Sequence, residues 1–166
     1  MLILALLGSA SELFYGLLAN KLASSGYRVS SAVQSRKVEL PKELRRLTEG
    51  GAMVALNYSK SRMVFSTGFV PEDVDGLIRI VRCLIPVEPD VLMLIGFRRM
   101  TSSDERVVKV LACRSEGELK KLKSEVKGEV IGEVLCGEVC PEDEAMKVVR
   151  RAQDKRYLPS PLRGVP

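Results

Sequence analysis

Continuous apolar runs alternate along this chain with segments in which apolar residues recur at helical spacing. Residues 2–7 and 90–97 are apolar runs of the kind that form strands buried on both faces of a parallel sheet. Residues 11–25 predict a helix in which Leu13, Leu17, Leu18 and Leu22 point inward and Ser11 is the N-cap. The remaining segments predict strands at 27–34, 105–113 and 129–136, a hairpin over 52–69, and helices at 41–51, 71–84, 117–126 and 141–156.

Strands that alternate with helices indicate an α/β fold, here a three-layer α/β/α sandwich around a mostly parallel sheet. We expect the hairpin over 52–69 to add antiparallel pairing, which would make the sheet mixed. A single domain is expected over residues 1–157, followed by a proline-rich tail over 158–166. Ligands of such sheets bind at the carboxyl ends of the strands, which here are Gly8–Ser11 and Gly96–Arg99.

The amino-acid composition excludes several classes of function. The chain has 166 residues, 46% of them apolar, with a net charge of +5 and no histidine. Without imidazole there is no Ser-His-Asp triad, no Cys-His dyad and no histidine metal ligand. The remaining acid–base candidates, Glu12, Tyr15, Asp90, Asp104 and Glu105, show no catalytic spacing, so we expect no catalytic and no metal-binding residues.

Two of the four cysteines lie close together in the sequence. Cys136 and Cys140 can be interpreted as a disulfide or as half of a metal site. The simpler interpretation is two small apolar side chains buried near the end of a strand, and this is the one we favour.

Targeting and charge patterns favour neither a membrane nor a nucleic acid. The apolar run at residues 2–7 has no preceding positive charge and is too short for a signal sequence or a membrane span, so we expect a cytoplasmic protein. Basic pairs such as Arg150-Arg151 lack interleaved aromatic residues, which make up only 5% of the chain. We therefore do not expect a nucleic-acid partner.

A strand that ends in glycine and leads through a short loop into a helix is the frame of a phosphate-binding loop, whose pattern is GxxxxGK[ST]. The first glycine is Gly8. The second glycine, the lysine and the hydroxyl residue of the pattern are replaced by Leu13, Phe14 and Tyr15. The lysine charge and the hydroxyl that would hold magnesium are thus missing from this segment.

Beyond this loop, five further elements follow in order along residues 2–135. They are the strand before Gly8, Gly26-Tyr27-Arg28-Val29, the Gly-Ala strand start at 51–55, the segment DVLMLIGFR at 90–98, and Lys109-Val110. Together they resemble MobB, the P-loop family that assists molybdopterin-guanine dinucleotide synthesis. The resemblance implies a P-loop-NTPase-like α/β fold.

The sequence departs from the family pattern at positions that carry the family's chemistry. Ile95 stands where the family has an acidic residue before glycine, and the segment 34–37 has no histidine. We expect the apolar replacements Leu13, Phe14 and Ile95 to pack together and fill the former ligand space, with Phe14 or Tyr15 close to Ile95.

The sequence thus favours a catalytically degenerate, MobB-like P-loop protein, a pseudo-NTPase. We expect a non-hydrolytic accessory or adaptor protein of molybdopterin cofactor metabolism that acts on a protein partner or as a homodimer, with Arg36, Lys37, Arg98 and Arg99 available for contacts. The alternative is a nucleotide- or phosphate-binding protein, with GTP or ATP as ligand and no other cofactor. Its ligand-binding residues would be Gly8, Ser9, Ala10, Ser11, Arg98 and Arg99, the two arginines replacing the lysine charge.

Overall fold

The computed structural model describes two separate compact units of this chain. The described residues are 1–34, 41–50, 54–58, 63–67, 70–85 and 87–160. One unit comprises residues 1–34 and 80–166, and the other comprises residues 35–79, which lie within the range expected as one domain. Arg36 and Lys37, the motif residues 51–53 and the tail residues 161–166 lie outside the described residues.

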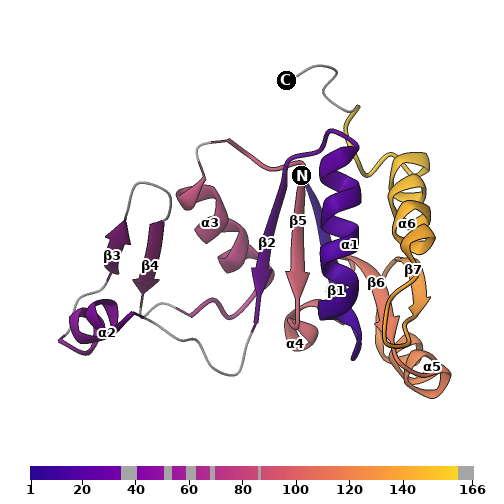
Figure 1. Cartoon of the computed structure of the whole chain (residues 1–166), viewed down its shortest axis with the longest axis horizontal. Coiled ribbons are helices and arrows are strands. Elements are labelled where there is room, and N and C mark those ends of the chain that lie inside the picture. The colour runs from indigo at the N-terminus through magenta and orange to yellow at the C-terminus, as the bar shows by residue number, and fades with distance from the viewer. Residues whose placement is uncertain (35–40, 51–53, 59–62, 68–69, 86, 161–166) are drawn as a thin grey trace. The chain divides into compact units, whose positions relative to one another are not determined.

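The larger unit is built on one sheet of five parallel strands (Figure 1). The strand order is β2-β5-β1-β6-β7, and every pairing in this sheet is parallel. The strands are β1 (Leu2–Leu7), β2 (Val29–Val33), β5 (Val91–Ile95), β6 (Val108–Cys113) and β7 (Val130–Leu135). All residues of β5 and β6 are buried, and so are five of the six in β1. The prediction of central parallel strands from continuous apolar runs is confirmed.

Helices cover both faces of this sheet, which makes three layers. Helices α1 (Ser11–Ser24) and α6 (Glu142–Asp154) contribute to one hydrophobic cluster with alternate residues of the strands, such as Leu4 and Val110. Leu7 and Leu111 alternate to the opposite face. There α5 (Glu116–Glu125) packs on β6 and the short α4 (Arg98–Thr101) packs on β1. The α/β sandwich is therefore as predicted, although α4 was not anticipated.

The hairpin forms its own sheet in the smaller unit. β3 (Val54–Tyr58) and β4 (Met63–Thr67) pair with each other in antiparallel register, and α2 (Lys42–Glu49) contacts both strands. The boundary between the two units in the sequence falls within α3 (Val74–Leu84). The expectation of a mixed sheet is thus wrong, because the two strands satisfy their hydrogen bonds locally across a short connection.

The helices of the described residues include none that is long and apolar enough to cross a membrane.

Candidate functional site

The carboxyl ends of the parallel strands bring four connecting segments to one edge of the sheet. β1 ends at Leu7 and leads through Gly8-Ser9-Ala10 into α1. β6 ends at Cys113, immediately before Arg114, and β7 ends beside Cys136. β5 ends at Ile95, just before Gly96 and α4. This is the edge where parallel sheets bind ligands, and the predicted site residues all lie on it.

Gly8 lets the β1–α1 junction lie directly against β6. Its φ is +111°, and a Cβ atom there would lie 2.2 Å from the carbonyl oxygen of Ala112. That same oxygen accepts a hydrogen bond from the Ala10 backbone N–H at 3.0 Å, and the Ala10 side chain is fully buried. Glycine is therefore required here for close packing of the junction against β6.

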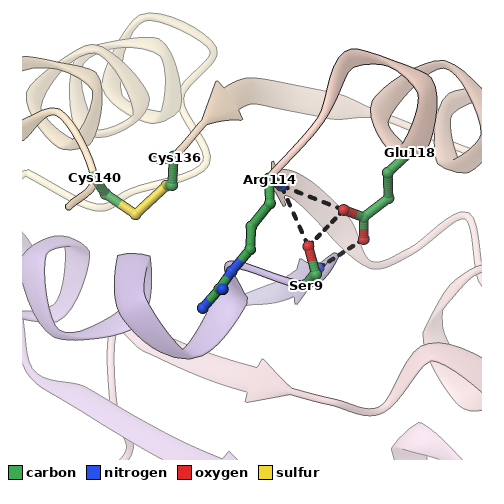
Figure 2. Close-up of a disulfide and its surroundings, with 5 residues drawn as sticks. All are labelled: Ser9, Arg114, Glu118, Cys136 and Cys140. Carbon is green, nitrogen blue, oxygen red and sulfur yellow. Dashed lines mark hydrogen bonds between the residues drawn. A yellow bond between two sulfur atoms is a disulfide. The ribbon is translucent and has the colours of Figure 1, made fainter. Parts of the chain in front are cut away.

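The Glu118 carboxylate, on the first turn of α5, occupies the hydrogen-bond donors beside this junction (Figure 2). One oxygen, Oε1, accepts from the Ser9 backbone N–H at 2.7 Å. The other, Oε2, accepts from the Ser9 hydroxyl at 2.5 Å and from the Arg114 N–H at 3.3 Å. The Arg114 N–H also donates to the Ser9 hydroxyl oxygen at 3.2 Å. An internal carboxylate thus lies where the loop offers donors to an anion.

These contacts stabilise the charged form of Glu118. The hydrogen bond from the Ser9 hydroxyl lowers the pKa of Glu118, and so do the backbone N–H groups of Ser9 and Arg114 and the charge of Arg98, while burial opposes them. Burial, with a smaller contribution from the Glu118 charge, raises the pKa of the Cys113 thiol to about 11. At neutral pH the edge therefore holds an ionised carboxylate beside a neutral thiol.

The first turn of α1 places two of the three pattern replacements in contact with the core. Phe14 is fully buried and belongs to the same hydrophobic cluster as Ile95. Tyr15 is partly buried and packs against this cluster. The Tyr15 hydroxyl also lies 3.0 Å from the Ser31 hydroxyl, within hydrogen-bond distance.

The expectation that Leu13 joins this packing is wrong, because its side chain is 42% exposed. A helix turns by about 100° per residue, so burial of Phe14 turns its neighbour toward solvent. The N-cap of α1 is Ala10 and not the predicted Ser11, which is the first residue of the helix. Leu18 and Leu22 are buried as predicted and Leu17 packs against the cluster, so Leu13 is the exception.

The two predicted arginines lie in α4 and differ in their surroundings. Arg98 forms an ion pair with Glu125 of α5, and its charge also acts on Glu118. Arg99 is exposed and has no hydrogen bond or ion pair among the described residues. The structure thus brings Ser9 to Glu118 and Arg98 to Glu125, whereas the N–H groups of Ala10 and Ser11 bond to Ala112 and Gly8.

Cys136 and Cys140 form a disulfide, with 2.05 Å between the sulfur atoms and 4.4 Å between the Cα atoms. Our preferred interpretation, two unlinked apolar side chains, is wrong, although both cysteines are buried as expected. The turn after β7 brings the two Cα atoms within bridging distance, and four-residue spacing alone does not reveal this. Cys83 and Cys113 are free thiols. Within the described ranges, no group of three or more acidic or cysteine residues could hold a metal ion.

Two of the other acid–base candidates, Asp90 and Asp104, have structural roles. Asp90 accepts three hydrogen bonds from Arg28, one from its backbone N–H and two from its guanidinium. These bonds lower the pKa of Asp90. Asp104 is held in the same way by Arg106, and its pKa is also lowered. Asp90 joins two segments that are 62 residues apart, whereas Asp104 holds a residue two positions along the same loop. These contacts explain the lowered pKa values of both carboxyls without catalysis.

Sequence reasoning missed Glu118 and Arg114, the residues that complete the site. The segment Ser115-Glu116-Gly117-Glu118 has the S-x-x-E pattern of a capping box, which predicts a helix start at α5. The Ser115 hydroxyl does accept the Glu118 N–H, at 3.3 Å. However, Ser9 lies 109 residues away from Glu118 in the sequence, and only the parallel pairing of β1 and β6 brings the two together.

Taken together, these features define a three-layer α/β protein with a close-packed junction at the end of its first strand. No family model matches the chain, and no curated protein does. Among solved structures, its fold resembles that of MobB. The structure of Bacillus subtilis MobB is 16% identical, with a TM-score of 0.63 over 96% of this chain and 99% of that chain.

Two further structures agree with this likeness. A molybdopterin-guanine biosynthesis protein B is 16% identical, with a TM-score of 0.62 over 93% of this chain and 98% of the other. A MobB protein homolog from Bacillus stearothermophilus is 14% identical, with a TM-score of 0.61 over 94% and 99%. At such identities the likeness concerns the fold, and the function must be argued from the residues.

Proposed function

We propose that this chain is a non-hydrolytic accessory protein on the MobB fold, which acts through protein contacts with a partner or with a second copy of itself. The observation that carries the proposal is the contact of Glu118 with Ser9. Three backbone N–H groups of the junction, those of Ser9, Ala10 and Ser11, already donate within the chain. A nucleotide phosphate would have to displace these bonds and would meet a negative charge at Glu118.

The residues that phosphoryl transfer requires are also replaced. A phosphate-binding loop uses a lysine to neutralise the terminal phosphates and a hydroxyl to hold magnesium. The corresponding positions here are Phe14, which is fully buried, and Tyr15, which lies beside Ser31. The side chain of a lysine at position 14 would extend from a buried position in the apolar core and not from the sheet edge. These replacements support a role without nucleotide turnover.

The likeness to MobB structures supports molybdopterin cofactor metabolism as the setting. One of them is described as a molybdopterin-guanine biosynthesis protein, and it aligns with 93% of this chain. In this setting the chain would assist the enzyme that joins a guanylyl group to molybdopterin. The exposed arginine Arg99 is available for such a contact.

Phosphate release from GTP and ATP with magnesium tests the non-hydrolytic role. We expect the purified chain to release no more phosphate than its Ser9→Ala variant, which lacks the hydroxyl at the junction. Magnesium-dependent release that falls in the Ser9→Ala variant would show that the junction turns over nucleotide. The proposed role in molybdopterin cofactor metabolism is tested separately. We measure whether the chain raises the yield of molybdopterin-guanine dinucleotide in an extract that lacks MobB. An unchanged yield would remove that part of the proposal.

A second candidate function is phosphate or nucleotide binding at Gly8–Ser11 without hydrolysis. It is favoured by the fact that the Ser9 donors already hold an anionic group with Arg98 nearby. Thermal unfolding distinguishes the two functions, because a ligand at 100 times its dissociation constant stabilises a fold by about 2.7 kcal/mol. Stabilisation by GTP or ATP that is lost in Ser9→Ala would favour this candidate over the first.

A further inference from the structure

The larger unit holds a cavity of about 440 Å³ at the amino ends of the strands, away from the Ser9 junction. Its volume is in the range of about 300–1,000 Å³ that is typical of small-molecule sites. The lining residues come from the segment before β2, from α6 and from the chain after α6: Tyr27, Gln153, Arg156, Leu158, Pro159 and Ser160. We propose that this cavity binds a small carboxylate with an apolar body, and that Arg156 holds the carboxylate group. The proposal goes beyond the accessory role and is independent of it.

The cavity lies where α1 and α6, which pack side by side, both end (Figure 1). The two helices end in the same kind of turn. After α1 the N–H of Tyr27 donates to the carbonyl oxygen five residues before it, at 3.2 Å, and after α6 the N–H of Tyr157 does the same, at 3.0 Å. The residue before the tyrosine must adopt a positive φ in such a turn, so glycine is preferred there. α1 follows this rule with Gly26, whose φ is +86°.

α6 has Arg156 at the position that Gly26 occupies after α1. Its φ is +58°, and it is the only non-glycine residue with a positive φ in the described ranges. A side chain is strained in this conformation, so the turn itself does not explain why an arginine stands here. The Arg156 side chain is exposed and forms no hydrogen bond or ion pair with any described residue. A guanidinium that lines a cavity without a protein partner points to an anionic ligand.

The other walls of the cavity specify what kind of anion fits. Tyr27 is buried, and its hydroxyl oxygen accepts a hydrogen bond from the Gln153 side-chain amide at 3.0 Å. The hydroxyl can still donate its own hydrogen to a carboxylate. Leu158 and Pro159 add apolar surface, and Arg156 is the only charged residue among those that line the cavity. One cation, one hydroxyl donor and apolar walls suit a single carboxylate on an apolar body, whereas a polyphosphate would require several cations.

A titration of the full chain with benzoate tests the site, followed through the nuclear magnetic resonance signals of the Gln153 side-chain amide and the Arg156 backbone amide. We expect both signals to shift in a saturable way. Benzamide, which has the same shape without the charge, should bind at least about tenfold more weakly, because it loses the charge-assisted bond to Arg156. Phenyl phosphate distinguishes the two anion classes. Absence of a saturable shift with benzoate would overturn the proposal, and so would tighter binding of phenyl phosphate.

Arg156→Gly separates a role in ligand binding from a role in the turn. This variant should bind benzoate at least about tenfold more weakly. Without ligand its thermal unfolding midpoint should rise by about 1–4 °C, because glycine adopts the positive φ without strain. The matched control is Arg150→Ala, which removes the same charge from an exposed position of α6 outside the cavity and should leave benzoate affinity unchanged. A loss of affinity below about threefold in Arg156→Gly, an equal loss in Arg150→Ala, or a lower midpoint in Arg156→Gly would each contradict the assignment.

Discussion

Truncation of Phe14 tests the interpretation that the lysine position of the phosphate-loop pattern has become part of the core. Phe14 is fully buried in the cluster that contains Ile95, and its neighbour Leu13 is 42% exposed. Truncation of a buried phenylalanine to alanine costs about 3–5 kcal/mol, from lost transfer energy and the cavity that remains. Leu13→Ala removes little buried surface and improves helix propensity, so its effect should stay within about 0.5 kcal/mol.

The assay is urea unfolding followed by circular dichroism, with thermal unfolding as a second measurement. For a chain of this length, each kcal/mol shifts the midpoint by about 2–4 °C, so Phe14→Ala should lower it by about 6–20 °C. Leu13→Ala is the matched control from the same helical turn. Equal losses for the two variants, or a loss below about 1 kcal/mol for Phe14→Ala, would refute the burial argument.

The same reasoning applies to a restored lysine. Phe14→Lys places an ammonium group at a fully buried position, where an unpaired charge is costly. We expect this variant to be at least as unstable as Phe14→Ala and to gain no affinity for GTP. A stable Phe14→Lys protein that binds GTP would show that the position still faces a ligand space.

Three other predictions concern the residues that shape the sheet edge and its opposite end. Gly8→Ala should cost more than about 1 kcal/mol in urea unfolding, since its φ of +111° and the nearby β6 carbonyl both exclude a side chain. Replacing Cys136 and Cys140 together by alanine should cost about 2 kcal/mol, the loop entropy of a five-residue ring. The bonds from Arg28 lower the pKa of Asp90, so their stabilisation is present above the unfolded value near 4 and is lost as the pH falls through the folded value. Asp90→Asn should therefore lower the unfolding midpoint at pH 7 more than at pH 3.

Each of these predictions has its own control. Gly16→Ala alters a glycine of α1 with open space around it, and it should not destabilise the protein as Gly8→Ala does. Reduction of the wild type by dithiothreitol should reproduce the loss caused by the double cysteine variant, and the variant itself should not respond. For the pH prediction, an equal effect of Asp90→Asn at both pH values would mean that the ionised carboxylate contributes nothing.

The parts of the fold that depend on local pattern were predictable. The apolar run at residues 2–7 predicts a strand that is buried on both faces, and these residues form the central strand β1. Gly8 after this strand correctly indicated a turn at the sheet edge. The apolar pattern of residues 11–25 correctly placed Leu18 and Leu22 in the core, but the buried residue of the first turn proved to be Phe14 and not Leu13.

The parts that depend on contacts between distant segments were not predictable. The partner of Ser9 is Glu118, and no periodicity links positions 109 residues apart. The disulfide between Cys136 and Cys140 requires a particular turn after β7, which their spacing permits but does not specify. The pairing of the hairpin was likewise ambiguous, because alternating residues do not reveal which sheet a strand joins.

The central claim, that the junction is closed and does not hydrolyse nucleotide, is tested most directly by nuclear magnetic resonance. The backbone amide signals of Ser9 and Arg114 are followed while GTP and magnesium are added to the wild-type chain. Their N–H groups donate to the Glu118 carboxylate, so Glu118→Gln should shift both signals and identify them as reporters of the site. The account predicts that neither signal moves in the wild type at millimolar GTP. A progressive, saturable shift of the Ser9 signal on addition of GTP would contradict it.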